Sequence, residues 1–484
     1  MMATKQDYWR VSGSDIIDAQ GQVVRMRGLC LGGWMNMENF VTGHPANESA
    51  FRRSVAAVLG ESKGRFFFER FLDYFTTEAD LAYIASLGMN VVRVAVNYRH
   101  FESDDAPFQY LEAGFTRLDR LIGWAAKHDV RVILDLHAVP GWQSPGWHCD
   151  NPGHRAHFWE QRGFQDRAVA LWKAFAERYG AEPTVAGYNL LNEPVASASQ
   201  LPQLHAYYRR ATEIIRLVDS RHIIFLDGNR YAQRCDQLEP PFDDNTAYGY
   251  HFYPEPVLET GTYPARIDDV DYDRSWLESS LLDRAAFMQQ YGVPAWAGEF
   301  GSVFNGKCSE SAGVQVVADM VGIMERLNHH WTLWHYKDIG AMGLLTLDPA
   351  SEWMERTRPV RTVKTALRCD FWIERLPTAI NRPLADLGET IRQMAGDLPG
   401  DWRTVSDELY AAVCQESLSQ MLLPAFADQF RGMSENEIDA MMQSFAFENC
   451  LPRHALVDVL RAACAPVNAP GSRDVSGSFA AGAV

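Results

Sequence analysis

The most constraining feature of this chain is a regular alternation of short apolar runs with longer segments of helical periodicity. Runs rich in β-branched and aromatic residues, with the length of buried strands, lie at 23–31, 90–96, 130–137, 185–192, 222–226, 247–252, 295–300 and 331–336. Segments of helical period lie between them at 78–87, 115–128, 164–179, 204–218, 276–291 and 314–327. This α/β alternation predicts a closed (β/α)8 TIM barrel, whose active site lies at the C-terminal ends of the strands.

The length of 484 residues accommodates one such barrel and an appendage. We expect the barrel over residues 1–370, with a small hairpin at 9–23 closing its floor. Strand signals then cease, and residues 371–467 carry helical periodicity whose apolar faces need a partner. This segment is therefore predicted to be a helical extension packed on the barrel. The small and polar residues 468–484 predict a disordered tail.

The charge of the chain limits its partners. A net charge of −17 argues against binding to nucleic acid or to an anionic membrane, because phosphate binding needs a cationic face. The sequence has no apolar run of transmembrane length, and its first residues lack the apolar core of a signal peptide. We therefore expect a cytoplasmic protein. The eight scattered cysteines form no CxxC pair and are expected to be reduced, buried thiols. No cofactor is expected, and the oligomeric state is left open.

Two glutamates each close an apolar run. Glu193 lies in Asn192-Glu193-Pro194 and Glu299 in Gly298-Glu299-Phe300-Gly301, so both carboxyl groups are expected where a strand enters a loop. Two carboxyl groups at close range split their pKa values, so that one stays protonated and the other ionised, as cleavage of a glycosidic bond requires. Either glutamate alone would more simply be a helix cap or an ion-paired residue. The pair, accompanied by polar and aromatic groups at other strand ends, favours catalysis.

Arg93 lies inside the apolar run Val91–Ala95. A buried charge is costly unless an opposite charge is near, and Glu299 is the expected partner. An arginine there would favour the ionised glutamate that a nucleophile requires. A single strand histidine is more often a core residue than a functional one. Because His137 and His251 both fall at the predicted rim, we expect both in the site.

The loop after the third strand carries several polar and aromatic residues. His148, Cys149 and His154 suggest a metal site, but their spacing is not a common zinc pattern, and no metal is predicted. The preferred interpretation is a sugar-binding lip, with Trp142 or Trp147 as a platform and His148 or Asp150 as a hydroxyl partner. A packed structural loop is the alternative, and both stay open at this point.

Four motifs in order carry a resemblance to a known family. They are Leu31-Gly32-Gly33-Trp34 with Glu38, Thr77-Glu78-Ala79-Asp80 before Leu87–Arg93, Asp135–Gly141, and Asn192-Glu193-Pro194. Over residues 20–340 the chain resembles glycoside hydrolase family 5, and within it the exo-β-1,3-glucanase-like branch. It departs from that branch at Phe300-Gly301-Ser302 and at His335-Tyr336-Lys337-Asp338, which leaves the substrate open.

The resemblance implies a role for each matching residue. Glu193 would be the acid/base, Glu299 the nucleophile, and Asn192 the ligand of the sugar 2-hydroxyl. Arg93 and Tyr253 would hydrogen-bond the nucleophile. Glu38 would bind hydroxyls of the non-reducing sugar, and Trp334 would form the floor under its ring. His137 and His251 would line the same subsite.

The expected function is that of a retaining β-glycosidase that works by double displacement on an oligosaccharide or glycoconjugate. A β-glucoside or a β-mannoside is favoured. The long insertions at 39–76 and 140–164 would enclose the reacting sugar in a pocket, which favours release from chain ends. A transglycosylase or a furanosidase on the same scaffold is the alternative. A non-catalytic carbohydrate-binding barrel is disfavoured, because all the expected catalytic groups are present.

Overall fold

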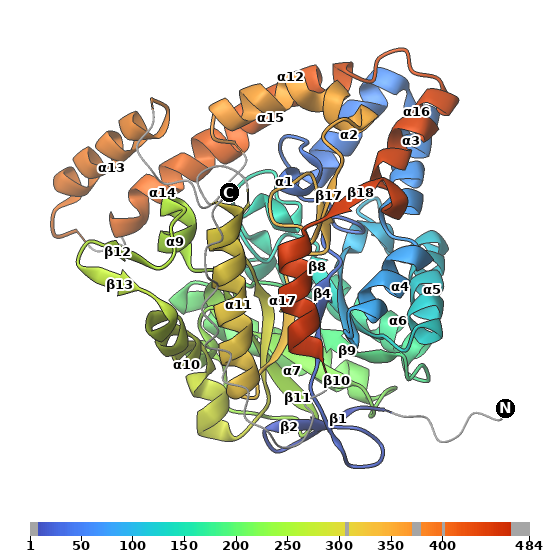
Figure 1. Ribbon diagram of the computed structural model, residues 1–484, viewed down its shortest axis with the longest axis vertical. Coiled ribbons are helices and arrows are strands. Elements are labelled where there is room, and N and C mark those ends of the chain that lie inside the picture. The colour runs from blue at the N-terminus through green and yellow to red at the C-terminus, as the bar shows by residue number, and fades with distance from the viewer. Residues whose placement is uncertain (1–7, 305–308, 370–378, 399–401, 466–484) are drawn as a thin grey trace, which may run out of the picture.

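The computed structural model describes residues 8–304, 309–369, 379–398 and 402–465. Eight parallel strands close into a barrel, in which the last strand pairs with the first (Figure 1). In chain order they are β4 (Arg27–Cys30), β5 (Val91–Asn97), β8 (Arg131–Ala138), β9 (Val185–Asn189), β10 (Ile223–Asp227), β11 (Thr246–Phe252), β14 (Ala295–Phe300) and β15 (His330–Leu333). The predicted fold class is confirmed. Several predicted strands were too long, because their apolar runs continue into the loops at the rim of the barrel.

Amphipathic helices cover the outside of the barrel, and all six expected from periodicity are present. They are α4 (Glu78–Ser86), α5 (Glu112–Lys127), α6 (Arg162–Tyr179), α7 (Leu201–Arg216), α10 (Arg274–Tyr291) and α11 (Glu310–Arg326). Between β10 and β11 the chain forms only the short turns α8 (Asn229–Ala232) and η5 (Cys235–Gln237). None of the helices in the described ranges combines the length and the apolarity needed to cross a membrane.

The floor of the barrel is closed as the sequence predicted. The strands β1 (Arg10–Ser12), β2 (Asp15–Ile17) and β3 (Val23–Val24) form a small antiparallel sheet, dark blue at the bottom of Figure 1. Trp9, Ile16 and Met26 pack there against Phe225 and Trp296 of the barrel interior. This apolar plug excludes water from the end of the barrel opposite the glutamates.

Insertions build up the rim. The chain forms α1 (Asn39–Thr42), α2 (Glu48–Leu59) and α3 (Glu61–Phe75) after β4, and η1 (Tyr98–His100) with the hairpin β6 (Glu102–Ser103) and β7 (Ala106–Tyr110) after β5. The loop after β8 contains η2 (Trp147–Cys149) and η3 (His157–Trp159), and η4 (Ala198–Gln200) follows β9. After β11 come α9 (Glu255–Thr260), β12 (Ala265–Ile267) and β13 (Val270–Tyr272).

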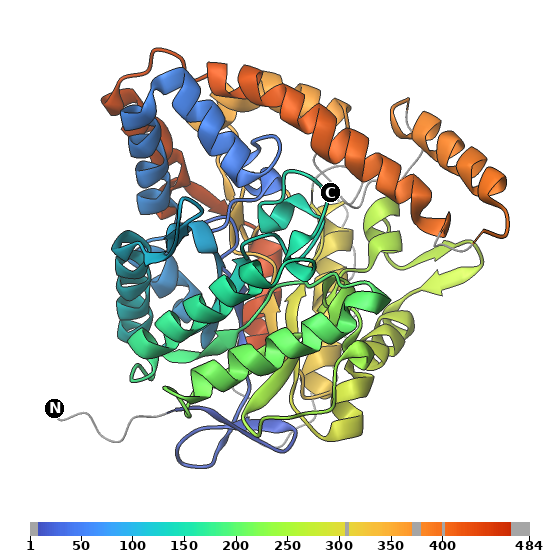
Figure 2. The ribbon, with the colours of Figure 1, turned by 180° about the vertical axis from the view of Figure 1, so that it is seen from behind.

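The C-terminal part of the chain is mainly helical and packs on these insertions. It comprises β16 (Lys337–Asp338), β17 (Leu345–Leu347), α12 (Glu352–Ala366), α13 (Asn381–Ala395), η6 (Trp402–Thr404), α14 (Val405–Tyr410), the π-helix η7 (Ala411–Leu418), α15 (Ser419–Asp428), α16 (Glu435–Met442), η8 (Gln443–Phe445), η9 (Phe447–Asn449), β18 (Cys450–Pro452) and α17 (His454–Cys464). Figure 2 shows the continuous run α14–η7–α15 across the top of the molecule, with α2 beside it. Trp353 stacks on Phe430 with 5.7 Å between ring centroids, and Lys63 Nζ donates to the carbonyl of Met433 at 2.9 Å.

The helix α17 lies in the wall of the barrel beside α11 (Figure 1). A β-carbon placed on Gly88, just after α4, would lie 3.0 Å from the Cβ of Cys464. Arg453, the residue before α17, donates from Nε to the carbonyl of Gly343 at 2.9 Å. The last described helix therefore covers the barrel between its seventh and first helical positions, although the predicted boundary at residue 370 placed it in an appended segment. The predicted tail 468–484 lies outside the described residues.

Candidate active site

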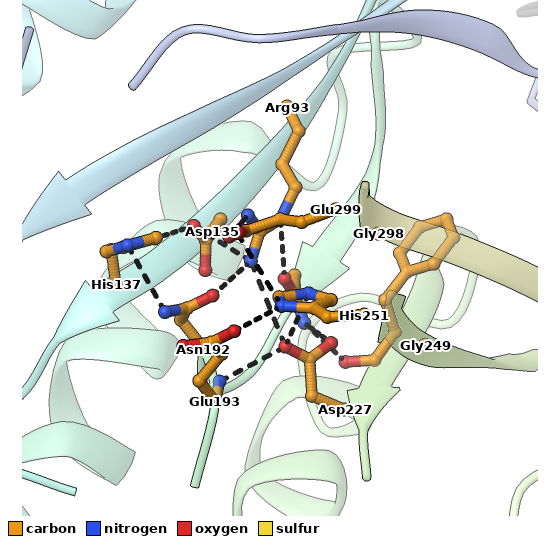
Figure 3. Close-up of polar contacts among 12 residues, drawn as sticks. Arg93, Asp135, His137, Asn192, Glu193, Asp227, Gly249, His251, Gly298 and Glu299 are labelled. Carbon is orange, nitrogen blue, oxygen red and sulfur yellow. Dashed lines mark hydrogen bonds and ion pairs between the residues drawn. The ribbon is translucent and has the colours of Figure 1, made fainter. Parts of the chain in front are cut away.

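The two glutamates meet at the C-terminal rim of the barrel. One oxygen of Glu193, one oxygen of Glu299 and a ring nitrogen of His251 all lie within 4.8 Å of one another (Figure 3). Glu299 lies in β14, next to His251 of β11 in the strand register. Glu193 follows β9 and has φ of 44°, a left-handed conformation that is strained for a residue with a side chain. Its backbone N–H donates to Asp227 Oδ2 at 3.2 Å, which holds this conformation.

The carboxylate of Glu299 accepts hydrogen bonds from two side chains. Arg93 Nη1 lies 2.6 Å from Glu299 Oε1, and the hydroxyl of Tyr253 donates to Oε2 at 2.9 Å. The predicted partnership of Arg93 with Glu299 is confirmed by this contact. The Arg93 side chain is fully buried and also lies 3.1 Å from Asp135 and 3.8 Å from Asp227. Burial opposes its charge, but the charges of Asp135 and Glu299 raise the pKa of Arg93 well above its usual value.

Each carboxylate oxygen of Glu193 lies near the ring of a histidine. His251 Nδ1 lies 2.7 Å from Oε1, and His148 Nε2 lies 3.4 Å from Oε2. Burial alone would raise the pKa of Glu193, but the hydrogen bond and charge of His251 outweigh it and lower the pKa to about 2. Burial opposes the charged form of His251, yet the charges of Glu299 and Asp227 raise the pKa of this imidazole. The contact with His251 thus favours the ionised form of Glu193.

His137 links the amide and carboxyl groups on the opposite side of the site. Its Nδ1 lies 2.7 Å from Asp135 Oδ2, and its Nε2 lies 3.2 Å from Asn192 Nδ2 and 3.4 Å from Glu38 Oε1. Burial opposes the charge of this ring, but Asp135 and Glu38 raise the pKa of His137 to about 10. Burial raises the pKa of Glu38, and the hydrogen bond from His137 opposes that effect.

Trp334 joins this group. Its indole lies parallel to the ring of His137, with 5.3 Å between centroids and 13° between the planes. The structure thus brings together nine of the expected residues: Glu38, Arg93, His137, His148, Asn192, Glu193, His251, Glu299 and Trp334, with Tyr253 bonded to Glu299 as the tenth. An aromatic face next to paired donors and acceptors suits a sugar ring, which has apolar C–H faces and a rim of hydroxyls.

The structure corrects the expectation for Asp150. This residue is 1% exposed and serves as a structural anchor. Its carboxylate accepts hydrogen bonds from Asn47 Nδ2 at 2.6 Å, from the Ser49 backbone N–H at 2.7 Å and from Arg99 Nε at 3.0 Å. Because its acceptor oxygens are used within the protein, Asp150 is not available as the hydroxyl partner that the sequence suggested.

The candidate metal ligands of this loop do not come together, and the role of Trp142 as a sugar platform stays a prediction. The half-buried Trp142 ring packs against His157, with 6.0 Å between centroids. His148 faces Glu193, the Cys149 thiol donates to the carbonyl of Ser144, and His154 faces Glu408. These three side chains therefore point to different partners. Within the described residues, the grouping that would suit a metal by spacing is Glu193, His251 and Glu299, whose atoms are already engaged with one another and with Arg93.

Several polar residues of the site were missed from the sequence. Asp227 ends β10, accepts from Asn189 Nδ2 at 3.0 Å and lies 3.5 Å from His251 Nε2. Asp135 pairs with Arg93 and His137. A signal was present, because Asp135 lies within a predicted buried strand and Asp227 directly after another, and a buried carboxylate needs a cation to offset its desolvation. Gln143 was hidden in a loop, where it donates from Nε2 to the carbonyls of His137 and Asn192.

Comparison with known proteins agrees with this geometry. The model of the family Cellulase (glycosyl hydrolase family 5) matches residues 55–340. The chain is 38% identical over 467 residues to a protein named beta-xylosidase from Phanerodontia chrysosporium, covering 94% of this chain and 97% of that protein. It is 32% identical over 227 residues to a probable glucan 1,3-beta-glucosidase A from Aspergillus clavatus, covering 45% of this chain and 53% of that protein.

The solved structure of the cellulose synthase subunit Z (CcsZ) from Clostridioides difficile shares the fold. Its TM-score is 0.50 at 20% sequence identity, over 66% of this chain and 94% of that one. A barrel with two facing glutamates at its rim, together with these relatives, defines a glycoside hydrolase. The chain belongs to glycosyl hydrolase family 5.

Proposed function

We propose that the chain is a retaining β-glycosidase that removes single sugars from the non-reducing ends of β-linked glycosides. The observation that supports this mechanism is the pair Glu193 and Glu299, with oxygens within 4.8 Å of each other. Retaining enzymes hold their two carboxyl groups about 5–5.5 Å apart, whereas inverting enzymes leave about 6.5–9.5 Å for a water molecule. The short separation favours direct attack by one carboxylate on the anomeric carbon.

The partners of the two glutamates assign their roles in this proposal. Arg93 and Tyr253 both donate to Glu299, which fixes the orientation of its carboxyl group, as attack by a nucleophile requires. Glu193 lies between His251 and His148, and His251, which is hydrogen-bonded to it, is able to exchange a proton with it. Formation of the glycosyl ester removes the charge of Glu299, and Glu193 acts first as acid and then as base.

In this proposal His251 supplies the proton that Glu193 needs to act as the acid. A low pKa of Glu193 in the free site means that substrate binding must return a proton to it before the leaving oxygen is expelled. His251 can donate this proton, because its Nδ1 lies 2.7 Å from Glu193 Oε1.

For the sugar, a terminal β-D-xylosyl unit is the first candidate and a β-D-glucosyl unit the second. The relative named beta-xylosidase aligns over nearly the whole chain, including the C-terminal helices, whereas the glucan 1,3-beta-glucosidase aligns over about half. This order differs from the glucoside or mannoside expected from the sequence. Furanosides and transfer to a second sugar stay as alternatives on the same catalytic residues, and the cytoplasmic location stays a prediction.

The test is hydrolysis of 4-nitrophenyl β-D-xyloside, β-D-glucoside and β-D-mannoside, with the anomeric configuration of the first-formed product read by NMR. Retention and a preference for the xyloside or glucoside are expected. Glu299→Gly should lose at least about 10⁴-fold in kcat, and azide should restore part of the activity as an inverted glycosyl azide. An inverted product from the unaltered enzyme, or full activity in Glu299→Gly, would refute the proposal. Product analysis at high acceptor concentration separates hydrolysis from transfer.

A further inference from the structure

One loop contacts both the acid/base and the C-terminal helices. In the loop after β8, His148 Nε2 lies 3.4 Å from Glu193 Oε2. Later in the same loop, His154 Nε2 lies 3.0 Å from Glu408 Oε2 and His154 Nδ1 lies 3.5 Å from Glu416 Oε1. The helical segment thus reaches the loop that carries a direct neighbour of Glu193.

The loop between these two histidines is tightly held. A β-carbon placed on Gly146 would lie 2.4 Å from His148 Nδ1, so the ring folds back over a backbone position that has room only for glycine. Asn36 Nδ2 donates to the carbonyl of His148 at 2.9 Å, and Asp150 is anchored by Asn47, Ser49 and Arg99. A shift at one end of such a segment is transmitted to the other end, because packed and hydrogen-bonded segments deform little.

The helical side of the contact is unusual. Glu408 lies in α14 and Glu416 in the π-helix η7, an eight-residue stretch of a helix type that is rare and often found at functional sites. Gln420, one turn further on in α15, donates from Nε2 to the carbonyl of Pro152 at 2.8 Å. The hydrogen bond to Glu408 raises the pKa of His154, which favours the charged ring between the two carboxyl groups. The side chains of Glu408, Glu416 and Gln420 therefore attach the loop to the C-terminal helices.

We propose that α14 and the π-helix position His148 against the acid/base Glu193, so that the C-terminal helices take part in acid catalysis. His154, Glu408 and Glu416 are positioning residues in this proposal, and they act through His148 without touching the substrate. The inference rests on the proposed retaining mechanism, in which Glu193 protonates the leaving oxygen.

The geometry explains why such support matters. With His251 on one oxygen of Glu193 and His148 on the other, rotation of the carboxyl group is restricted from both sides. If the loop moves, His148 withdraws and the carboxyl group is free to rotate away from the leaving oxygen. A displacement of about 1 Å at a reacting group costs up to about 10²-fold in rate.

The experiment compares two substrates that differ only in their need for an acid. The kcat/KM values of a phenyl and a 2,4-dinitrophenyl β-glycoside, of the sugar that the enzyme prefers, are measured for the unaltered enzyme, for Glu408→Gln/Glu416→Gln and for His154→Gln. Phenol leaves only when protonated, whereas 2,4-dinitrophenolate leaves without a proton. We expect a loss of about tenfold or more on the phenyl glycoside and of less than about twofold on the dinitrophenyl glycoside.

Two further variants provide a second test of the loop and a control. Gly146→Ala displaces the His148 ring from the other end of the loop and should give the same selective loss on the phenyl glycoside. Glu389→Gln removes an exposed carboxylate that pairs with Arg392 on α13, 2.6 Å away, and should leave both values unchanged.

The ratio of the two kcat/KM values decides the question even for a variant that folds poorly, because both substrates report on the same active fraction. A fallen ratio for the phenyl glycoside supports the proposal. An unchanged ratio in His154→Gln and in Glu408→Gln/Glu416→Gln overturns it. Failure of the unaltered enzyme to cleave either glycoside would instead refute the proposed function.

Discussion

Cys464, at the end of the last described helix, lies against Gly88, at the end of the first helix of the barrel wall. A β-carbon on Gly88 would lie 3.0 Å from the Cβ of Cys464, and Gly88 has φ of 84°, a conformation that favours glycine. The strand β18, just before α17, also pairs with β17 near the rim. The C-terminal segment therefore both covers the wall of the barrel and extends its rim.

Removal of the C-terminal segment is predicted to destabilise the barrel. A chain ending at Cys369 loses the rings of Phe430 and Phe445, which pack on Phe67 and Phe71 of α3. It also loses Phe426, which packs on Phe51 of α2. Each buried aromatic side chain contributes about 1.5–3 kcal/mol, so the loss approaches the whole stability of a typical domain. We expect aggregated protein, measured by size-exclusion chromatography and thermal melting.

The matched control is a chain ending at Ala465, which keeps every contact described above. It should melt within a few degrees of the full-length chain. A stable and fully active chain ending at Cys369 would show that the helices are a dispensable module.

Arg93 is predicted to be required for stability as well as for activity. Its guanidinium lies within 4.0 Å of three carboxylates, from Asp135, Asp227 and Glu299, and Arg93→Met would remove the arginine charge that all three share. Breaking a buried pair by removing one partner costs about 3–5 kcal/mol. We expect a loss of that size in urea unfolding, together with loss of turnover.

An exposed ion pair gives the comparison for this variant. Arg274 pairs with Asp319 at 2.7 Å and is 50% exposed, so Arg274→Met should cost less than about 1 kcal/mol. Equal effects of the two substitutions would contradict the role assigned to Arg93.

The sequence was sufficient for the barrel and for most of the site, because both follow from local patterns. Each strand is a short apolar run, and the residues of the candidate site lie at the ends of these runs or within them, as Arg93 and Glu299 show. Polar residues in an apolar strand are conspicuous because of the cost of burying them. The partnership of Arg93 and Glu299 could be predicted on that ground alone.

The loop residues could not be placed in the same way. Asp150 and His148 lie two positions apart, yet one anchors the loop and the other faces Glu193. The difference depends on Asn47 and Ser49, which come from an insertion about a hundred positions earlier in the chain. The place of α17 in the barrel wall depends likewise on a contact with Gly88 that no local pattern encodes.

The charge on His137 predicts a pH dependence of stability. Burial opposes this charge, but Asp135 and Glu38 raise the pKa of His137 in the folded protein to about 10, above the value of about 6.5 in an unfolded chain. The stabilisation is therefore complete below about pH 6.5 and is lost as the pH rises toward 10. Urea unfolding of the unaltered protein should show falling stability over this interval.

The variant His137→Gln isolates this contribution. Gln cannot carry the proton, so the difference in unfolding free energy between the two proteins should shrink between pH 6.5 and pH 10. The carboxyl groups of Asp135 and Glu38, which face the ring, are present in both proteins. A difference that stays constant with pH would show that His137 is neutral in the folded state.

Glu38 is predicted to recognise the terminal sugar. It lies at the start of the insertion that follows β4, is 4% exposed, and its Oε1 has only a long contact, 3.4 Å to His137 Nε2. A buried acceptor with a single long contact is poorly satisfied, and a sugar hydroxyl placed between Glu38 and His137 would donate to it. Glu38→Gln keeps the shape but makes half of the group a donor, so kcat/KM on a natural β-linked oligosaccharide should fall by about 10²-fold. Trp142→Ala, in the β8 loop, should cost less on the same substrate.

Chromatography of the products of a labelled oligosaccharide checks the exo mode, since stepwise release of single sugars is expected. Early mid-chain fragments, or a smaller loss for Glu38→Gln than for Trp142→Ala, would show that the reacting sugar is not bound as a chain end at Glu38.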